Sequence, residues 1–196
     1  MTRNVSREKK LVRAPGELIQ KLKEAASRQG KTLYSYMTEV LEQAVKAYEL
    51  GLSLEDVIGD YEILGVYKEA GVTSVPRDFL EFMIKRFSSG DSEVLQRLWY
   101  HAGRWCGLYL KGRSSDPVNS LARMLRAGQF DLNEVDVRRK LGFVEFKCVS
   151  TLLSQERTLL VCSFIEGAMN SLGYGTLGNE CFKGIIRLRF SSSANP

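Results

Sequence analysis

The chain has 196 residues, of which 44% are hydrophobic and 26% charged. This is enough for a small N-terminal arm and one globular domain of about 110 residues. No apolar run approaches the roughly eighteen residues that a membrane span needs, and the N-terminus has no signal-peptide core. We therefore exclude a membrane-spanning protein and expect a cytoplasmic one without a membrane partner.

The positive charge is concentrated at the N-terminus. Residues 1–31 hold nine Lys or Arg against three Glu, a surplus of six, whereas the whole chain carries +5. The remainder is therefore close to neutral. Such a local excess favours contact with the phosphates of a nucleic acid, although a charged solubilising tail would have the same composition.

A short basic strand is predicted over residues 9–14. Neighbouring residues of a strand point to opposite faces, so Lys9, Leu11 and Arg13 share one face while Val12 and Ala14 share the other. The first face is mostly long and polar, and the second is small and apolar.

Two amphipathic helices are predicted after this strand. Pro15 suits a first helical turn, and Gly30 suits the position just past the end of the first helix. Thr32 is a good N-cap for the second helix. The short connection predicts a helical hairpin, whose apolar positions are Leu18, Leu22 and Ala26 in the first helix and Leu33, Met37, Val40, Leu41 and Ala44 in the second.

A single strand beside two helices leaves backbone groups unpaired, and some forty residues bury too little surface to fold alone. We therefore expect a homodimer or a dimer of dimers. Pairing the strand with its symmetry mate gives a two-stranded antiparallel ribbon, which fits the major groove of double-stranded DNA. The plainer alternative is a solvated basic strand with a hairpin that only dimerises.

Residues 8–50 resemble the ribbon-helix-helix family of transcriptional regulators, in Val12-Arg13-Ala14-Pro15 and in Gly30-Lys31-Thr32. The resemblance implies that Lys9, Leu11 and Arg13 face base edges, while backbone N–H groups around Lys31 and Thr32 hold a phosphate. Leu11 departs from the polar residue usual in the family, and a thymine methyl would accommodate it.

A helical bridge is predicted over residues 51–88. Ser53 and Asp56 form a capping box that opens one helix, with Val57, Ile58, Tyr61 and Leu64 on one side. A second helix begins near Pro76. Its aromatic stripe predicts either core or dimer interface: Phe79, Phe82, Met83 and Phe87.

Residues 89–196 are predicted to form an α+β domain. The expected order is a long helix over residues 94–106, a helix over 118–125, a strand over 144–148, a helix over 164–172 and a closing strand over 186–190. Gly103 and Gly107 leave a smooth stripe on the long helix, where another backbone can approach.

Residues 80–190 are similar to the 4-vinyl reductase domain. The similar segments are Gly103-Arg104-Trp105-Cys106-Gly107, Val161-Cys162-Ser163-Phe164, Glu180-Cys181-Phe182-Lys183-Gly184 and Arg189-Phe190. The resemblance implies a sensor that binds a small hydrophobic effector. In regulators of that family, cysteines and an acidic residue hold zinc. Cys162 and Cys181 match two of these positions, but Glu180 is misplaced and Leu188 replaces a cysteine, so the set is incomplete.

No metal, cofactor or catalytic set is expected. The four cysteines contain no Cys-x-x-Cys pair, so free thiols are the expectation: Cys106, Cys148, Cys162 and Cys181. The single histidine, His101, has no partner at helical spacing, and no phosphate-binding loop is present. We therefore do not expect an enzyme.

The sequence as a whole predicts a sequence-specific transcriptional regulator of α+β class. Its parts are a ribbon-helix-helix DNA-binding domain (1–50), a helical bridge (51–88) and a sensor-like α+β domain (89–196). Two alternatives stay open. One is a DNA-binding protein of nucleoid or partition type without sequence choice; the other is a ligand- or metal-binding protein whose arm only dimerises.

Overall fold

The computed structural model describes the chain except for residues 1–10, 12, 70–71, 89, 128 and 192–196. The described residues form seven helices and one four-stranded antiparallel sheet, which is a mixed α+β fold. The chain divides into two compact units, residues 1–58 and 59–196. The division falls inside helix α3 (Leu54–Glu69).

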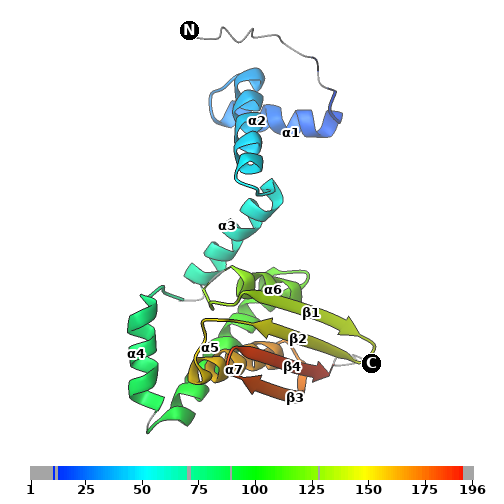
Figure 1. Cartoon of the computed structure of the whole chain (residues 1–196). Helices are drawn as coiled ribbons and strands as arrows, with labels where there is room; N and C mark the ends of the chain where they lie inside the picture. Colours follow the sequence, from blue (N-terminus) through cyan, green and yellow to red (C-terminus); the bar gives the residue numbers. More distant parts are fainter. Residues whose placement is uncertain (1–10, 12, 70–71, 89, 128, 192–196) are drawn as a thin grey trace. The chain divides into compact units, whose positions relative to one another are not determined.

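The first unit contains the predicted helical hairpin, formed by α1 (Gly16–Arg28) and α2 (Leu33–Glu49) (Figure 1). Gly30 has φ +64° and follows the end of α1. Its N–H donates to the Ser27 carbonyl, and the Lys31 N–H donates to the Ala26 carbonyl. These two bonds satisfy carbonyls that the end of a helix leaves unpaired. The predicted glycine stop is confirmed.

The predicted strand before the hairpin is not formed by the residues that the structure describes. Lys9 and Val12 lie outside the described residues. Leu11, Arg13, Ala14 and Pro15 have no regular secondary structure and are exposed. A strand needs a neighbour for its backbone N–H and C=O groups, and a single chain supplies none here.

Helix α3 starts at the predicted capping box. The Ser53 hydroxyl accepts from the Asp56 N–H at 3.0 Å and donates to the Asp56 carboxylate at 2.5 Å. The predicted apolar side is not buried, since Val57, Ile58 and Tyr61 are exposed. Its buried residues are Gly59, Ile63 and Tyr67.

Helix α4 (Arg77–Ser88) exposes its aromatic stripe. Phe79, Phe82 and Phe87 are all exposed, and Ile84 is the buried side chain. The prediction that this stripe is core is therefore wrong for these three phenylalanines. The alternative prediction, a dimer interface, stays a prediction.

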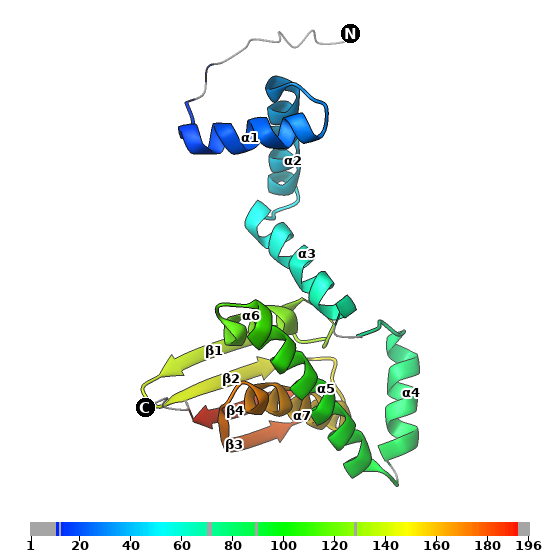
Figure 2. The ribbon, with the colours of Figure 1, turned by 180° about the vertical axis from the view of Figure 1, so that it is seen from behind.

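The sheet of the second unit has the order β1-β2-β4-β3. Its strands are β1 (Glu134–Lys140), β2 (Phe143–Val149), β3 (Gly175–Phe182) and β4 (Ile185–Ser191). Helices α5 (Ser92–Arg113), α6 (Pro117–Arg126) and α7 (Gln155–Ser171) cover one face of it (Figures 1 and 2). The predicted alternation is confirmed in β4, and in β2 the predicted apolar side chains are buried but Glu145 between them is buried too. The buried apolar side chains of the two strands are Val144, Phe146, Cys148, Ile186, Leu188 and Phe190.

Helix α7 is the centre of the core, and α5 packs along it on the side away from the sheet (Figure 2). The two backbones touch at glycines. A Cβ on Gly103 would lie 2.0 Å from the Phe164 carbonyl oxygen, and one on Gly167 would lie 2.0 Å from the Tyr100 carbonyl oxygen. The predicted close approach of a backbone at the α5 glycines is confirmed.

The expectation of four free thiols is wrong. Cys162 on α7 and Cys181 on β3 form a disulfide, with their Cα atoms 6.8 Å apart. The fold brings an internal helix against an edge strand, and the sequence spacing gave no sign of this approach. Cys106 and Cys148 are free and buried, and burial raises the pKa of each thiol to about 12.

Among the described helices, none combines the length and apolar character that crossing a membrane requires.

Candidate functional site

The residues predicted to contact DNA lie at or just before the hairpin. Arg13 is exposed, and Leu11 is 93% exposed, while Lys9 lies outside the described residues. Thr32 caps α2, because its hydroxyl oxygen accepts from the Ser35 N–H. Lys31 forms an exposed ion pair with Glu39, at 2.6 Å. Exposed pairs add little stability, so a phosphate can compete for this ammonium group.

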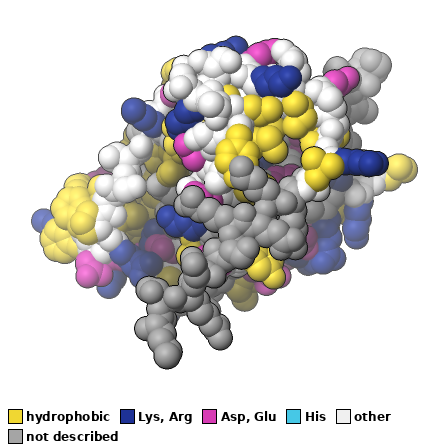
Figure 3. Space-filling model, turned by 90° about the horizontal axis from the view of Figure 1, so that it is seen from above, with side chains coloured by type: hydrophobic (Ala, Val, Ile, Leu, Met, Phe, Trp, Pro, Cys, Tyr) yellow, Lys and Arg dark blue, Asp and Glu magenta, His cyan; other side chains and the backbone are white. Residues whose placement is uncertain are grey.

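The hairpin has almost no core of its own. The buried side chains of α1 and α2 are two alanines, Ala26 and Ala47. Larger apolar side chains stay at the surface, including Leu18, Leu41 and Val45, each more than half exposed. Figure 3 shows hydrophobic side chains open at the surface beside Lys and Arg. This hairpin needs a further apolar surface to be stable.

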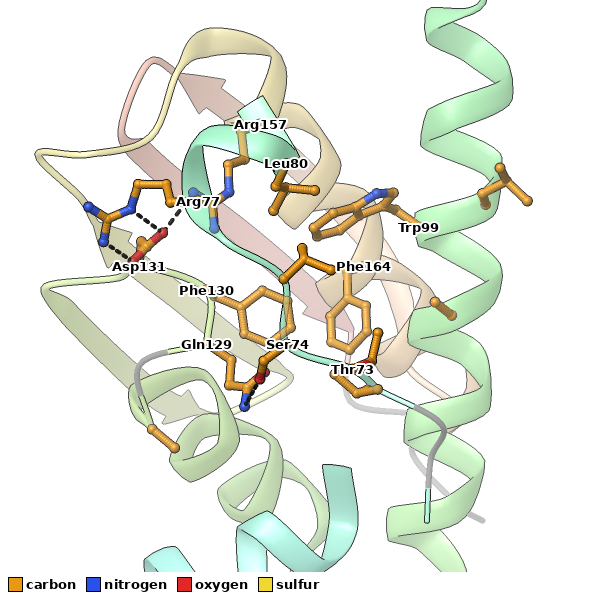
Figure 4. A pocket seen from close by; sticks show the side chains of 15 residues that line it. Thr73, Ser74, Arg77, Leu80, Trp99, Gln129, Phe130, Asp131, Arg157 and Phe164 are labelled. Carbon is orange, nitrogen blue, oxygen red and sulfur yellow. Dashed lines mark hydrogen bonds and ion pairs between the residues drawn. The ribbon is translucent and has the colours of Figure 1, made fainter. Parts of the chain in front are cut away.

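A second candidate site is a cavity of about 800 Å³ in the second unit (Figure 4). It lies between the segment before α4, helix α4, helix α5, the residues before β1, and α7. Aromatic rings form one wall: the Trp99 and Phe130 centroids are 6.4 Å apart, and the Phe130 and Phe164 centroids are 4.9 Å apart. The volume and the apolar wall are typical of a small-molecule site.

One end of the cavity is charged. Asp131 lies between two arginines, with 2.7 Å from its carboxylate to Arg77 Nη2 and 2.7 Å to Arg157 Nη1 (Figure 4). Arg157 Nη1 also lies 3.4 Å from Glu81. The hydrogen bond from Arg77, reinforced by Arg157, holds the pKa of the Asp131 carboxyl below its usual value. The charges of the two arginines and the two carboxylates in this cluster therefore cancel.

Arg157 is the polar group that this arrangement leaves incomplete. Its side chain is 3% exposed, and its Nε finds no hydrogen-bond partner among the described residues. A buried N–H without an acceptor costs about 1 to 3 kcal/mol. An apolar ring in the cavity would cover the aromatic wall, whereas an acceptor oxygen would reach this N–H only after the side chains around it shift, because the nitrogen itself is buried.

Sequence reasoning missed Arg157 and Asp131. They are 26 residues apart in chain order, one on α7 and one before β1. Neither belongs to a motif. The available signal was a single charged residue, Arg157, at the start of an apolar helix, and such a residue is common at a helix terminus.

The residues considered as metal ligands do not lie together. Cys162 and Cys181 are bonded to each other, and His101 is exposed, with its ring 6.0 Å from Tyr100. Within the described part of the chain, no three His, Cys, Asp or Glu side chains lie together as a metal ion would require.

Comparison of the chain with protein-family models, with curated proteins and with solved structures finds no significant match.

Proposed function

We propose that the protein is a homodimeric transcriptional regulator whose N-terminal segments pair into a ribbon that reads the DNA major groove. The observation that carries this proposal is a hairpin with only Ala26 and Ala47 buried, placed directly after a strongly basic segment. A second copy would cover the exposed apolar side chains. It would also supply the missing partner for the segment containing Leu11 and Arg13.

Two kinds of contact support DNA as the ligand of this dimer. In a strand, Lys9, Leu11 and Arg13 project from one face, where Arg13 would reach guanine O6 and N7. Lys31 and the start of α2 at Thr32 would hold a phosphate. Because these phosphate contacts are electrostatic, we expect the DNA affinity to fall strongly as the salt concentration rises.

A second function, effector binding, is favoured by the cavity and by the unpaired Nε of Arg157. We propose a small hydrophobic effector with one acceptor oxygen. Control of DNA binding requires that the effector bind one state of the dimer more tightly than another, whatever its absolute affinity.

The experiment that tests DNA reading is selection of genomic fragments by the purified protein at near-physiological salt. Wild type is expected to enrich one short palindrome. Arg13→Ala should weaken binding to it by about 1 to 3 kcal/mol. Arg28→Ala is the matched control, because it removes the same charge from the exposed last turn of α1 and should cost much less.

Equal loss by Arg13→Ala on the palindrome and on random DNA would contradict base reading and favour a nucleoid or partition role. If the wild-type protein retains no DNA, the proposal that the N-terminal arm binds DNA is wrong.

A further inference from the structure

Helix α5 carries a stripe of apolar side chains, interrupted by His101, on the side opposite its buried face. We call it the α5 stripe; it consists of Val94, Leu98, His101, Trp105, Leu108 and Gly112. These residues are spaced four, three, four, three and four apart. At about 100° per residue they fall within a narrow arc, directly across the helix from the buried residues Gly103, Cys106, Gly107 and Leu110.

The α5 stripe is exposed along its length. Leu98 is 60% exposed, Trp105 71% and Leu108 52%. Within the second unit, α5 is the outer helix, with α7 between it and the sheet (Figure 2). Alternating spacing of three and four along 22 residues is the pattern by which one helix packs along another.

We propose that the α5 stripe pairs antiparallel with the α5 stripe of a second copy. The stripe is complementary to itself about Gly103. Antiparallel pairing sets Leu98 against the partner's Leu108, His101 against the partner's Trp105, and Val94 against the partner's Gly112. In the last of these pairs the valine meets a glycine whose surroundings are open, since a Cβ at Gly112 would find no heavy atom within 4 Å in its own chain.

A parallel pair would pack less well. It would stack Trp105 on the partner's Trp105 and face Gly112 with the partner's Gly112, which crowds one layer and leaves a gap in another. On one flank of an antiparallel pair, Leu95 would lie by the partner's Tyr109 and Ala102 by the partner's Ala102. Ala102 and Leu98 also line the cavity, so this flank borders the proposed effector site.

The other flank of the stripe is basic, and this gives the pairing a distinctive dependence on salt. It consists of Arg97, Arg104 and Lys111. In an antiparallel pair, Arg97 lies near the partner's Lys111 and Arg104 near the partner's Arg104. Salt screens this repulsion, so association through α5 should tighten as salt rises. DNA binding should weaken under the same change.

The proposed function already requires a second copy of the chain, so the inference rests on that function for the existence of a homodimer. The surface is separate from the α1–α2 hairpin, and the two can be tested separately. The Leu41→Glu variant of the full chain places a charge on the exposed apolar side of α2 and should weaken pairing of the arm alone.

Cysteine cross-linking tests the pairing. The full-length variant Leu98→Cys with Leu108→Cys should form a covalent dimer under mild oxidant, with or without Leu41→Glu. Each single-cysteine variant should give little, because equivalent residues 98 would lie about 15 Å apart along the helices. The native cysteines contribute little background, since Cys106 and Cys148 are buried and the other two are bonded.

Equal cross-linking of the double and single variants would overturn the antiparallel pair, and no cross-linking would overturn α5 pairing altogether. A cross-link that forms without Leu41→Glu but is lost with it would show that only the arm holds the dimer. That outcome also overturns the inference and leaves the proposed function intact.

Charge reversal gives an independent measurement. Arg97→Glu should tighten association of the Leu41→Glu chain roughly fivefold or more in sedimentation at low salt, because it replaces two repulsive pairs by two attractive ones. Arg97 would face the partner's Ala102 in a parallel pair, so an unchanged dissociation constant would overturn the antiparallel arrangement.

Discussion

Asp131 joins the charges at the end of the cavity, and its backbone has φ +52°, a conformation that Asp and Asn tolerate better than most residues. Asp131→Asn keeps this tolerance and the side-chain size while it removes the charge shared by Arg77 and Arg157. We expect the free energy of unfolding at pH 7 to fall by about 1 to 3 kcal/mol, because Arg157 is left with a more distant carboxylate.

The effect of Asp131→Asn should depend on pH. The folded state lowers the pKa of this carboxyl, so its contribution is complete above the carboxyl's ordinary pKa and is lost as pH falls through the folded value. Urea unfolding at pH 7 and at pH 2 to 3 should show the variant approaching wild type in acid. Asp136→Asn, which breaks the exposed pair with Arg138, should cost less than about 1 kcal/mol throughout.

Arg157 gives a prediction about the proposed effector site. Arg157→Lys keeps a positive charge near Asp131 but removes the unpaired Nε. We expect binding of acetophenone, an aromatic ring with one acceptor, to weaken about tenfold, which corresponds to one hydrogen bond. Binding of toluene, which has no acceptor, should change little. Equilibrium dialysis measures both, and an equal loss for the two compounds would argue against a hydrogen bond to Nε.

The crossing of α5 and α7 depends on small residues. Gly167→Ala would place a methyl group 2.0 Å from the Tyr100 carbonyl oxygen, so the helices must separate. We expect destabilisation of about 3 kcal/mol, measured by thermal unfolding. Gly65→Ala in α3 is the control: no heavy atom lies within 4 Å of its added Cβ, so it should stabilise the protein by up to about 1 kcal/mol. Equal behaviour of the two variants would contradict a close crossing.

The elements that sequence reasoning found are those with local signals. Gly30 marks the end of α1 and Thr32 marks the start of α2, and both act through neighbouring backbone groups. The central strands β2 and β4 have both neighbours in the sheet and a buried face, so their apolar residues alternate clearly. The edge strands β1 and β3 were missed, because an edge strand buries less and its sequence carries more charge or glycine.

The close backbone approach on α5 was predictable, because Gly103 and Gly107 are a local signal. The apolar pattern did not say which side of the helix faces the core: the buried face contains Gly103 and Gly107, whereas Leu98 and Trp105 are exposed. Close contact between backbones requires small side chains, so hydrophobicity alone does not identify the buried side. The charged end of the cavity was beyond prediction, because Arg157 and Asp131 meet only through the tertiary fold.

At the scale of the whole molecule, the two units should respond separately to change. If the proposed ribbon forms, it can form only in a dimer, so Leu41→Glu should lower DNA affinity more than tenfold. Thermal unfolding of residues 59–196 should stay unchanged. Gln43→Glu adds the same charge to an exposed position of α2 without removing an apolar group, and should cost far less. If both variants bind DNA equally well, the hairpin is not the dimer interface on which DNA binding depends.

The strand order has a consequence for biosynthesis. Strand β4, made after the other three, lies in the interior of the sheet and is hydrogen-bonded to both β2 and β3. Until the ribosome has released residues 185–191, β2 lacks one neighbour and β3 lacks its only one. The hairpin of α1 and α2 emerges long before that. If the arm pairs with a second copy as proposed, that pairing can therefore begin while the second unit still lacks its last strand.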